Sequence, residues 1–214
     1  MHSALETLSA DLRRIFGARL QSLVAYGAPD DPDGVHTLAL VDRLDFHDLT
    51  RCAPRTGDWR RAGPAVPLLL SREEFLRTLD VFPVEYGGII ANHRLVAGED
   101  ILAGLRVSEA DLRRGCELQA KSHLIHLREA YVETGGSPPL VARLVAASAP
   151  ALSALLANLQ QLDSGAAERA GLTPAFVREV AAADANQIAD PSALLARYLI
   201  AVERLWQEVD RWRA

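Results

Sequence analysis

Cysteine, lysine and methionine are all scarce in this chain of 214 residues. Its two cysteines are Cys52 and Cys116, and two thiols form neither a disulfide framework nor a four-cysteine zinc site. We therefore expect both to behave as small, partly buried apolar residues. Lys121 is the single lysine, whereas arginine supplies the other 22 of the 23 basic residues. We interpret this preference for arginine as a compositional bias of the source and not as a sign of function. It nevertheless makes Lys121 a position of interest.

The chain also lacks an excess of positive charge and an unbroken apolar run of membrane-spanning length. Its net charge of −5 argues against a broad nucleic-acid-binding surface. No run of apolar residues reaches the roughly 18 that a membrane helix needs, and the first six residues lack the features of a secretory signal. We therefore expect a cytoplasmic protein with no membrane partner and no nucleic-acid partner.

The first half of the sequence alternates short apolar runs with helical and polar segments. Apolar residues three and four apart predict a helix over residues 4–20. A capping-box pattern at Ser71–Glu74 predicts a helix over 72–80. Residues 45–62 suggest a short helix plus a loop that holds Trp59, and 84–90 fit either a helix or a strand. Apolar runs predict strands at 23–27, 37–41, 66–70 and 95–98.

The second half is dominated by helical signals. Cap residues at Ser108, Thr173 and Asp190 each precede an apolar periodic segment, and Pro150 is expected to kink or split a long Ala/Leu-rich helix. The last helix carries a wide apolar stripe, residues 194–212, that suits either a core or a homodimer surface. We therefore predict an α+β fold, with a mixed sheet and flanking helices in residues 1–105 and an all-α bundle in residues 106–214.

The order of these elements resembles the nucleotidyltransferase superfamily, in the small prokaryotic form with a kanamycin-nucleotidyltransferase-like layout. The resemblance covers nearly the whole chain and rests on four segments: Leu23–Ala28, Thr37–Asp42, Val66–Ser71 and His93–Asp100. It implies a nucleotide site beside a small-residue turn after the first strand. It also implies a pair of aspartates on the second strand that hold Mg²⁺, with a third carboxylate on a neighbouring strand.

The sequence departs from this pattern at each of those positions. The turn is Gly27-Ala28 and lacks the serine of many members. The positions that match the aspartate pair hold Gly34 and His36, and the third carboxylate is replaced near Val66. None of these residues supplies the anionic oxygen that Mg²⁺ prefers. The resemblance with this degenerate motif therefore predicts a protein that binds a nucleotide, another small ligand or a partner but has lost metal-dependent nucleotidyl transfer.

Two alternatives remain open. The chain is an active Mg²⁺-dependent transferase if Asp31, Asp33 and Glu117 form a relocated site, although a proline-broken loop holds Mg²⁺ poorly. It is a structural protein if the last helix mediates a homodimer. His123 and His126 lie three apart on a predicted helix, but no third metal ligand accompanies them, so no metal site is predicted.

Seven residues are candidates for binding a nucleotide or small-molecule ligand. Four lie around the first strand's end or at the start of the second strand, and His93 precedes the fourth strand. Glu117 and Lys121 lie four apart on the first helix of the second half, where the resemblance places a general base and a phosphate contact. The complete set is Tyr26, Gly27, Ala28, His36, His93, Glu117 and Lys121.

Overall fold

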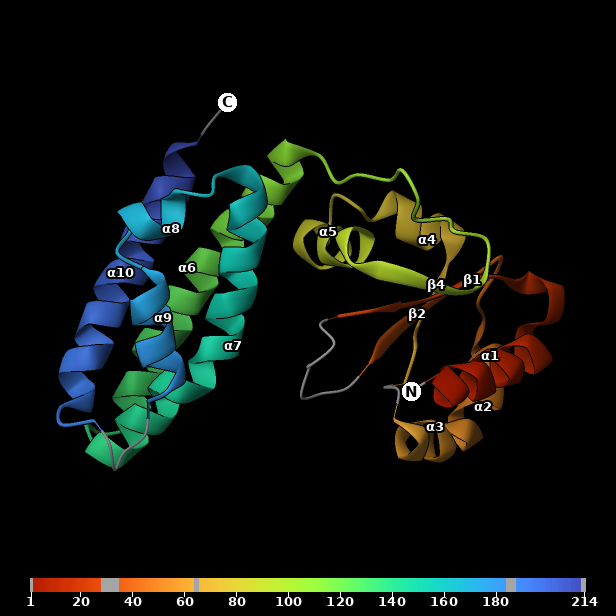
Figure 1. Ribbon diagram of the computed structural model, residues 1–214, viewed down its shortest axis with the longest axis horizontal. Helices are drawn as coiled ribbons and strands as arrows, with labels where there is room; N and C mark the ends of the chain where they lie inside the picture. Colours follow the sequence, from red (N-terminus) through yellow and green to blue (C-terminus); the bar gives the residue numbers. More distant parts are fainter. Residues whose placement is uncertain (1, 28–34, 64–65, 184–187, 213–214) are drawn as a thin grey trace. The chain divides into compact units, whose positions relative to one another are not determined.

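The computed structural model describes residues 2–27, 35–63, 66–183 and 188–212 (Figure 1). The chain divides into two compact units, Met1–Val107 and Ser108–Ala214. The first unit is α+β and the second is helical, so the predicted fold class is confirmed. Ala28, Asp31, Asp33 and Gly34 lie outside the described residues.

The first unit is built on a mixed four-stranded sheet with the order β3-β2-β1-β4. Strand β1 pairs antiparallel with both β2 and β4, and β2 pairs parallel with β3. In chain order the elements are α1 (His2–Phe16), β1 (Leu20–Tyr26), β2 (His36–Val41), α2 (Phe46–Cys52), α3 (Thr56–Ala62), β3 (Leu68–Ser71), α4 (Arg72–Arg77), α5 (Pro83–Ala91) and β4 (His93–Gly98), with 3₁₀ turns at Gly17–Arg19 and Ala53–Arg55.

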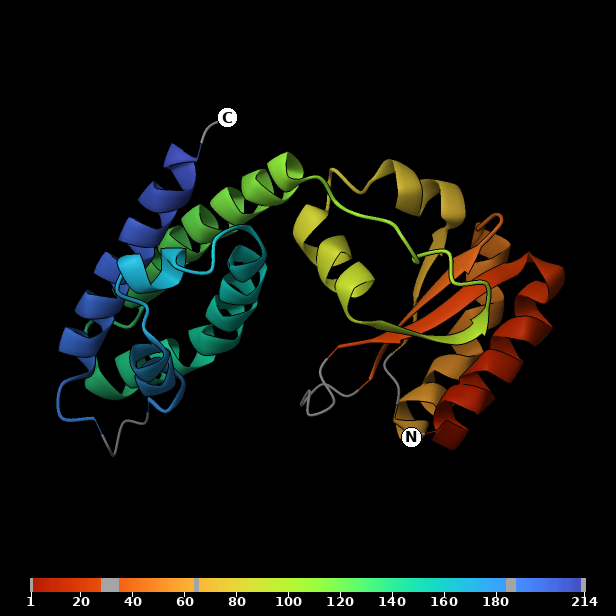
Figure 2. The same cartoon turned by 45° about the horizontal axis from the view of Figure 1, so that its top comes forward.

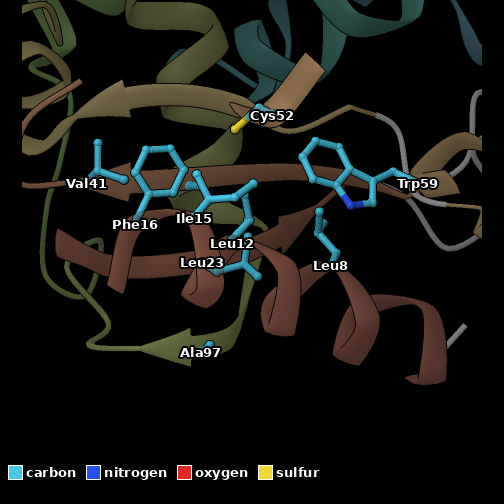
Figure 3. Close-up of a cluster of buried hydrophobic side chains, with 10 residues drawn as sticks. Leu8, Leu12, Ile15, Phe16, Leu23, Val41, Cys52, Trp59 and Ala97 are labelled. Carbon is cyan, nitrogen blue, oxygen red and sulfur yellow. The ribbon is translucent and has the colours of Figure 1, made fainter. Parts of the chain in front are cut away.

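Helices cover both faces of this sheet (Figure 2). On one face Leu23 of β1 and Val41 of β2 pack with α1 and with Trp59 of α3 (Figure 3). On the other face Val24 and Leu38 pack with side chains from α4 and α5. Successive residues of a strand point to opposite faces, so two covered faces require an unbroken apolar run. This requirement explains why β1 and β2 lack the polar alternation of a half-exposed strand.

Several local predictions for the first unit are corrected by the structure. The region 45–62 is helical almost throughout, and Trp59 is 1% exposed in the core instead of lying in a polar loop. His93 opens β4 instead of preceding it, whereas residues 84–90 belong to a helix, α5, which was one of the two alternatives left open. The helix after Ser71 ends at Arg77, short of the predicted residue 80.

Other local signals in this unit are confirmed. The Ser71 capping box forms in both directions, with the Glu74 amide donating to the Ser71 hydroxyl at 3.1 Å and the Ser71 amide donating to the Glu74 carboxylate at 2.7 Å. Strand β3 begins at Leu68, directly after Pro67, and it is an edge strand as the proline requires.

Two buried carboxylates tie helices to the sheet in the first unit. Asp48 of α2 accepts two hydrogen bonds from Arg19, at 2.6 and 2.8 Å, which link α2 to the entry of β1. Asp11 of α1 accepts from Arg55 and from the Trp59 indole, at 2.8 and 3.1 Å, which links α1 to the segment before and within α3. Because a buried charge is costly without a partner, each pair fixes the helices on that face.

The second unit consists of helices α6 (Glu109–Glu133), α7 (Pro138–Leu162), α8 (Ala166–Arg169), α9 (Pro174–Ala181) and α10 (Pro191–Arg211). The predicted caps are confirmed, because the side chains of Ser108, Thr173 and Asp190 each accept from a backbone amide at the start of their helix. Pro150 lies inside α7, which remains one helix and is visibly curved (Figure 2). The apolar stripe of α10 is buried within this unit, with Val202 and Leu205 at 0% exposure.

Helix α7 qualifies the expectation about membrane helices. Among the described residues it is the one helix long and apolar enough to cross a membrane by length and composition, even though Arg143 interrupts its apolar run. It packs against α6, α9 and α10, and residues such as Val145 and Leu152 are fully buried there. These contacts identify α7 as the core helix of the bundle.

The junction of β4 with β1 gives a prediction about Gly98. A Cβ at this position would lie 2.1 Å from the carbonyl oxygen of Gln21, and its φ is +83°. Gly104 has a similar φ of +78° but open space around it. We expect Gly104→Ala to lower the free energy of unfolding by about 1–2 kcal/mol from backbone strain alone, and Gly98→Ala by at least about twice that. Urea denaturation of both variants measures this, and equal losses would contradict the predicted overlap with Gln21.

The Arg19–Asp48 pair gives a prediction about pH. The hydrogen bonds from Arg19 outweigh burial and hold the pKa of Asp48 below its usual value. The resulting stabilisation is present above the unfolded-state pKa, about 3.9, and is lost as the pH falls through the lower folded-state value. We therefore expect Asp48→Asn to flatten the loss of stability below about pH 4 in urea denaturation. Arg19→Met is expected to flatten this loss of stability similarly. A wild-type dependence of stability on pH in both variants would contradict the contribution of the Arg19–Asp48 pair.

Candidate functional site

One end of the sheet gathers three of the candidate residues. Because β1 is antiparallel to both neighbours, its last residue, Tyr26, lies opposite the first residue of β2, His36, and the first residue of β4, His93. The three residues therefore form a row across three adjacent strands, which we call the sheet-end row. All three are half-buried. Each of the three is a predicted ligand-binding candidate, but their position side by side on adjacent strands was not predicted.

The Tyr26 and His36 rings form an aromatic pair at this edge. Their centroids lie 5.6 Å apart and their planes are inclined by 25°, which is a stacked arrangement. Tyr26 also packs against the apolar cluster shared by the strands and helices α4 and α5. Burial raises the pKa of its phenol, so the hydroxyl stays protonated near neutral pH. The pair therefore combines two stacked aromatic rings with a phenol that stays protonated.

His93 is held from both sides of its ring. Nδ1 lies 2.8 Å from the Ile90 carbonyl oxygen, and Nε2 lies 2.9 Å from the Asp100 carboxylate. Asp100 also accepts from the backbone amide of Ala103 at 3.1 Å. The pairing of His93 with Asp100 was not predicted from the sequence, because the turn that returns Asp100 to His93 has no distinctive motif. The ring of His93 is therefore fixed at the start of β4.

The turn after β1 begins as the sequence predicts. Gly27 follows the last residue of β1 with a φ of 100°, a left-handed conformation that side chains with a Cβ rarely adopt. A glycine here keeps the backbone accessible at the end of the row. Its neighbour Ala28, and the acidic residues Asp31 and Asp33, lie outside the described residues.

The described part of the chain contains no group of three or more His, Cys, Asp or Glu side chains placed to hold a metal ion. The buried carboxylates of the first unit, Asp11 and Asp48, are engaged by arginines. Val66, which matches the third carboxylate position of the resemblance, is exposed and precedes β3. Among the described residues, the sheet end offers a phenol, two imidazoles, backbone groups and the Asp100 carboxylate that is paired with His93.

The remaining candidates, Glu117 and Lys121, lie on α6 in the second unit. Glu117 accepts from Arg113 at 2.8 Å, and the Lys121 ammonium lies 3.5 Å from the centroid of the Trp206 ring. Although they lie four apart on one helix, each of the two side chains thus contacts a residue other than its neighbour in the candidate set. His126, on the same helix, lies 3.5 Å from Glu129, and His123 has a separate partner on α10.

Comparison with solved structures identifies the fold. The crystal structure of spectinomycin adenyltransferase AAD(9) from Enterococcus faecialis matches with a TM-score of 0.54 over 98% of this chain and 99% of that one, at 12% identity. The chain has a nucleotidyltransferase-like fold. A nucleotidyltransferase-like protein from Exiguobacterium sibiricum also matches, with a TM-score of 0.39 and 14% identity over 97% of this chain and 74% of that one. No protein-family model and no curated protein sequence matches significantly.

The predicted resemblance to nucleotidyltransferases is therefore confirmed at the level of fold. At 12% identity the match to the adenyltransferase speaks for the architecture alone. It assigns no role to individual residues of this chain.

The contact between Lys121 and Trp206 gives a prediction for this candidate site. A cation–π contact at a partly exposed position contributes about 0.5–1 kcal/mol to stability. We expect a double-mutant cycle with Lys121→Met and Trp206→Leu to show a coupling energy of that size in urea denaturation. A coupling energy near zero would contradict a stabilising contact between Lys121 and Trp206. The lysine would then be free to contact a ligand.

Proposed function

We propose that this nucleotidyltransferase-like protein binds a nucleotide, or a small molecule related to one, at the sheet-end row beside Gly27. We further propose that it no longer carries out metal-dependent nucleotidyl transfer. The observation that supports this proposal is the replacement of the expected carboxylate on β2 by His36, whose ring stacks on Tyr26.

The chemistry of Mg²⁺ supports the loss of transfer. Magnesium prefers carboxylate, phosphate and water oxygens in an octahedral arrangement and binds imidazole poorly. An imidazole at position 36 therefore does not substitute for an aspartate in neutralising the pyrophosphate that leaves during the reaction.

The same residues support retained binding. The stacked pair of Tyr26 and His36 offers an aromatic surface, and stacking of a base on such a surface contributes about 1–3 kcal/mol. Gly27 leaves the backbone open to a close approach by phosphate oxygens, as glycine-containing turns do in many phosphate sites. The similar adenyltransferase was crystallised with ATP and spectinomycin, so these two compounds are the first to test.

Two other functions remain as outcomes of the same work. An active transferase would require Asp31, Asp33 and Glu117 to hold Mg²⁺. A homodimer through the last helix was suggested by the apolar stripe of α10. That stripe instead packs in the core of its own unit.

Isothermal titration with ATP, in Mg²⁺ and then in EDTA, tests the proposal directly. We expect the two dissociation constants to agree within about threefold, since no metal-bridging carboxylates take part. Tyr26→Ala is expected to weaken binding by about tenfold or more, the effect of one lost stacking contact. His47→Ala, at an exposed histidine of α2, is the matched control and should bind as the wild type does.

Strong dependence of ATP affinity on Mg²⁺ would contradict the loss of the metal site. Transfer of radiolabelled nucleotide to spectinomycin or to another hydroxyl compound would contradict it as well. If such transfer occurs, its abolition by Asp33→Asn would establish the relocated site. Equal ATP binding by wild type and Tyr26→Ala would remove the sheet-end row from the proposal.

A further inference from the structure

A cavity of about 480 Å³ lies between α6 and α7, and all of its lining residues belong to the second unit. We call it the α6/α7 cavity. Its volume falls within the range of about 300–1,000 Å³ that is usual for small-molecule sites. The cavity shares no residue with the sheet-end row, and the fold comparison gives it no role.

The two helices contribute different chemistry to this cavity. Helix α6 presents polar side chains at helical spacing, namely those of Gln119, Ser122 and His123. Helix α7 presents the small apolar residues Ala147 and Ala151, with leucines beside them. The short side chains of α7 create the open volume. The polar side chains of α6 line one side of it, and the apolar side chains of α7 line the opposite side.

His123 is anchored by a hydrogen bond to α10. Its Nε2 lies 2.6 Å from the Tyr198 hydroxyl, which is shorter than N–H···O bonds usually are and typical of an O–H donor. The Ser148 hydroxyl lies 2.7 Å from the Val145 carbonyl oxygen and 3.3 Å from the Tyr198 hydroxyl, and as a donor to the Tyr198 oxygen it leaves the Tyr198 proton for His123. We therefore assign Tyr198 as the donor to Nε2, which leaves the ring proton of His123 on Nδ1.

This assignment leaves open hydrogen-bonding groups on one side of the cavity. Within the described part of the chain, Nδ1 of His123 has no hydrogen-bond partner, and the same holds for the side chains of Gln119 and Ser122. Burial, and then the nearby His126, lower the pKa of His123, so its imidazole is neutral near pH 7. A neutral donor suits an uncharged acceptor, because this ring offers an anion no compensating charge.

We propose that the α6/α7 cavity binds an uncharged, largely apolar ring compound that accepts a hydrogen bond from Nδ1 of His123. The apolar body of the compound packs against the alanines of α7. Its carbonyl or ring-nitrogen acceptor meets His123, and adjacent polar groups on its edge meet Gln119 or Ser122. This site belongs to the second unit and does not depend on nucleotide binding at the sheet-end row.

Two bicyclic probes of nearly equal size test the proposal with the full chain. 2-Quinolinone carries a carbonyl acceptor and an N–H donor, whereas naphthalene carries neither. We expect titration of 2-quinolinone to shift the alanine-methyl NMR signal of Ala147. We also expect it to bind about two- to tenfold more tightly than naphthalene, which is the effect of one net hydrogen bond. Absence of any shift at millimolar 2-quinolinone would overturn the site, and equal affinities would overturn the role of His123 as donor.

A cavity-filling variant locates the probe. Ala151→Leu places a larger side chain in the cavity and is expected to weaken 2-quinolinone binding by about tenfold or more. Ala196→Leu makes the same change at an exposed alanine of α10 and should leave the affinity unchanged. Because both alanines are exposed helical positions, both variants are expected to fold. Binding by Ala151→Leu at wild-type affinity would place the probe elsewhere and overturn the proposal.

Discussion

Burial of both faces of β1 and β2 is the constraint on which the first unit depends. Helices α1 and α3 cover one face and α4 and α5 cover the other, so the strand interiors are mostly apolar, with Ser22 and Thr37 as buried polar exceptions. Polar side chains that could reach a ligand are then expected where the strands end. Antiparallel pairing brings three such ends together, and Tyr26, His36 and His93 occupy them. The candidate site is thus a consequence of how the core is covered.

The same constraint accounts for the use of the acidic residues. Carboxylates that enter the core of this unit are retained only with cationic partners, as the pairs of Asp48 with Arg19 and of Asp11 with Arg55 show. Both pairs hold helices on one face of the sheet, where they stabilise the scaffold. They are engaged in packing the fold, whereas the proposed site at the sheet end is built mainly from aromatic and imidazole groups.

Local signals in the sequence predicted local structure well. The caps at Ser71, Ser108 and Asp190 depend on side chains within three residues of the amides they bind, so a short pattern was sufficient. The element order was sufficient for the nucleotidyltransferase-like fold. Partners distant in the chain were not predictable. Trp59 reaches Asp11 across 48 residues, so its polar neighbours in the sequence misleadingly suggested a loop. His123 likewise meets its partner on α10 across 75 residues.

Each unit contains a tyrosine in contact with a histidine, but the two pairs are arranged differently. Tyr26 and His36 stack with their ring planes inclined by 25°, the arrangement on which the proposed stacking of a ligand depends. Tyr198 meets His123 edge-on and fixes one ring nitrogen through a hydrogen bond, which makes the other nitrogen a directional donor. Burial raises the pKa of both phenols and lowers that of His123, so these groups favour their uncharged forms. Neutral phenol and imidazole groups are poor ligands for a hard cation such as Mg²⁺, which agrees with the proposed loss of metal-dependent transfer.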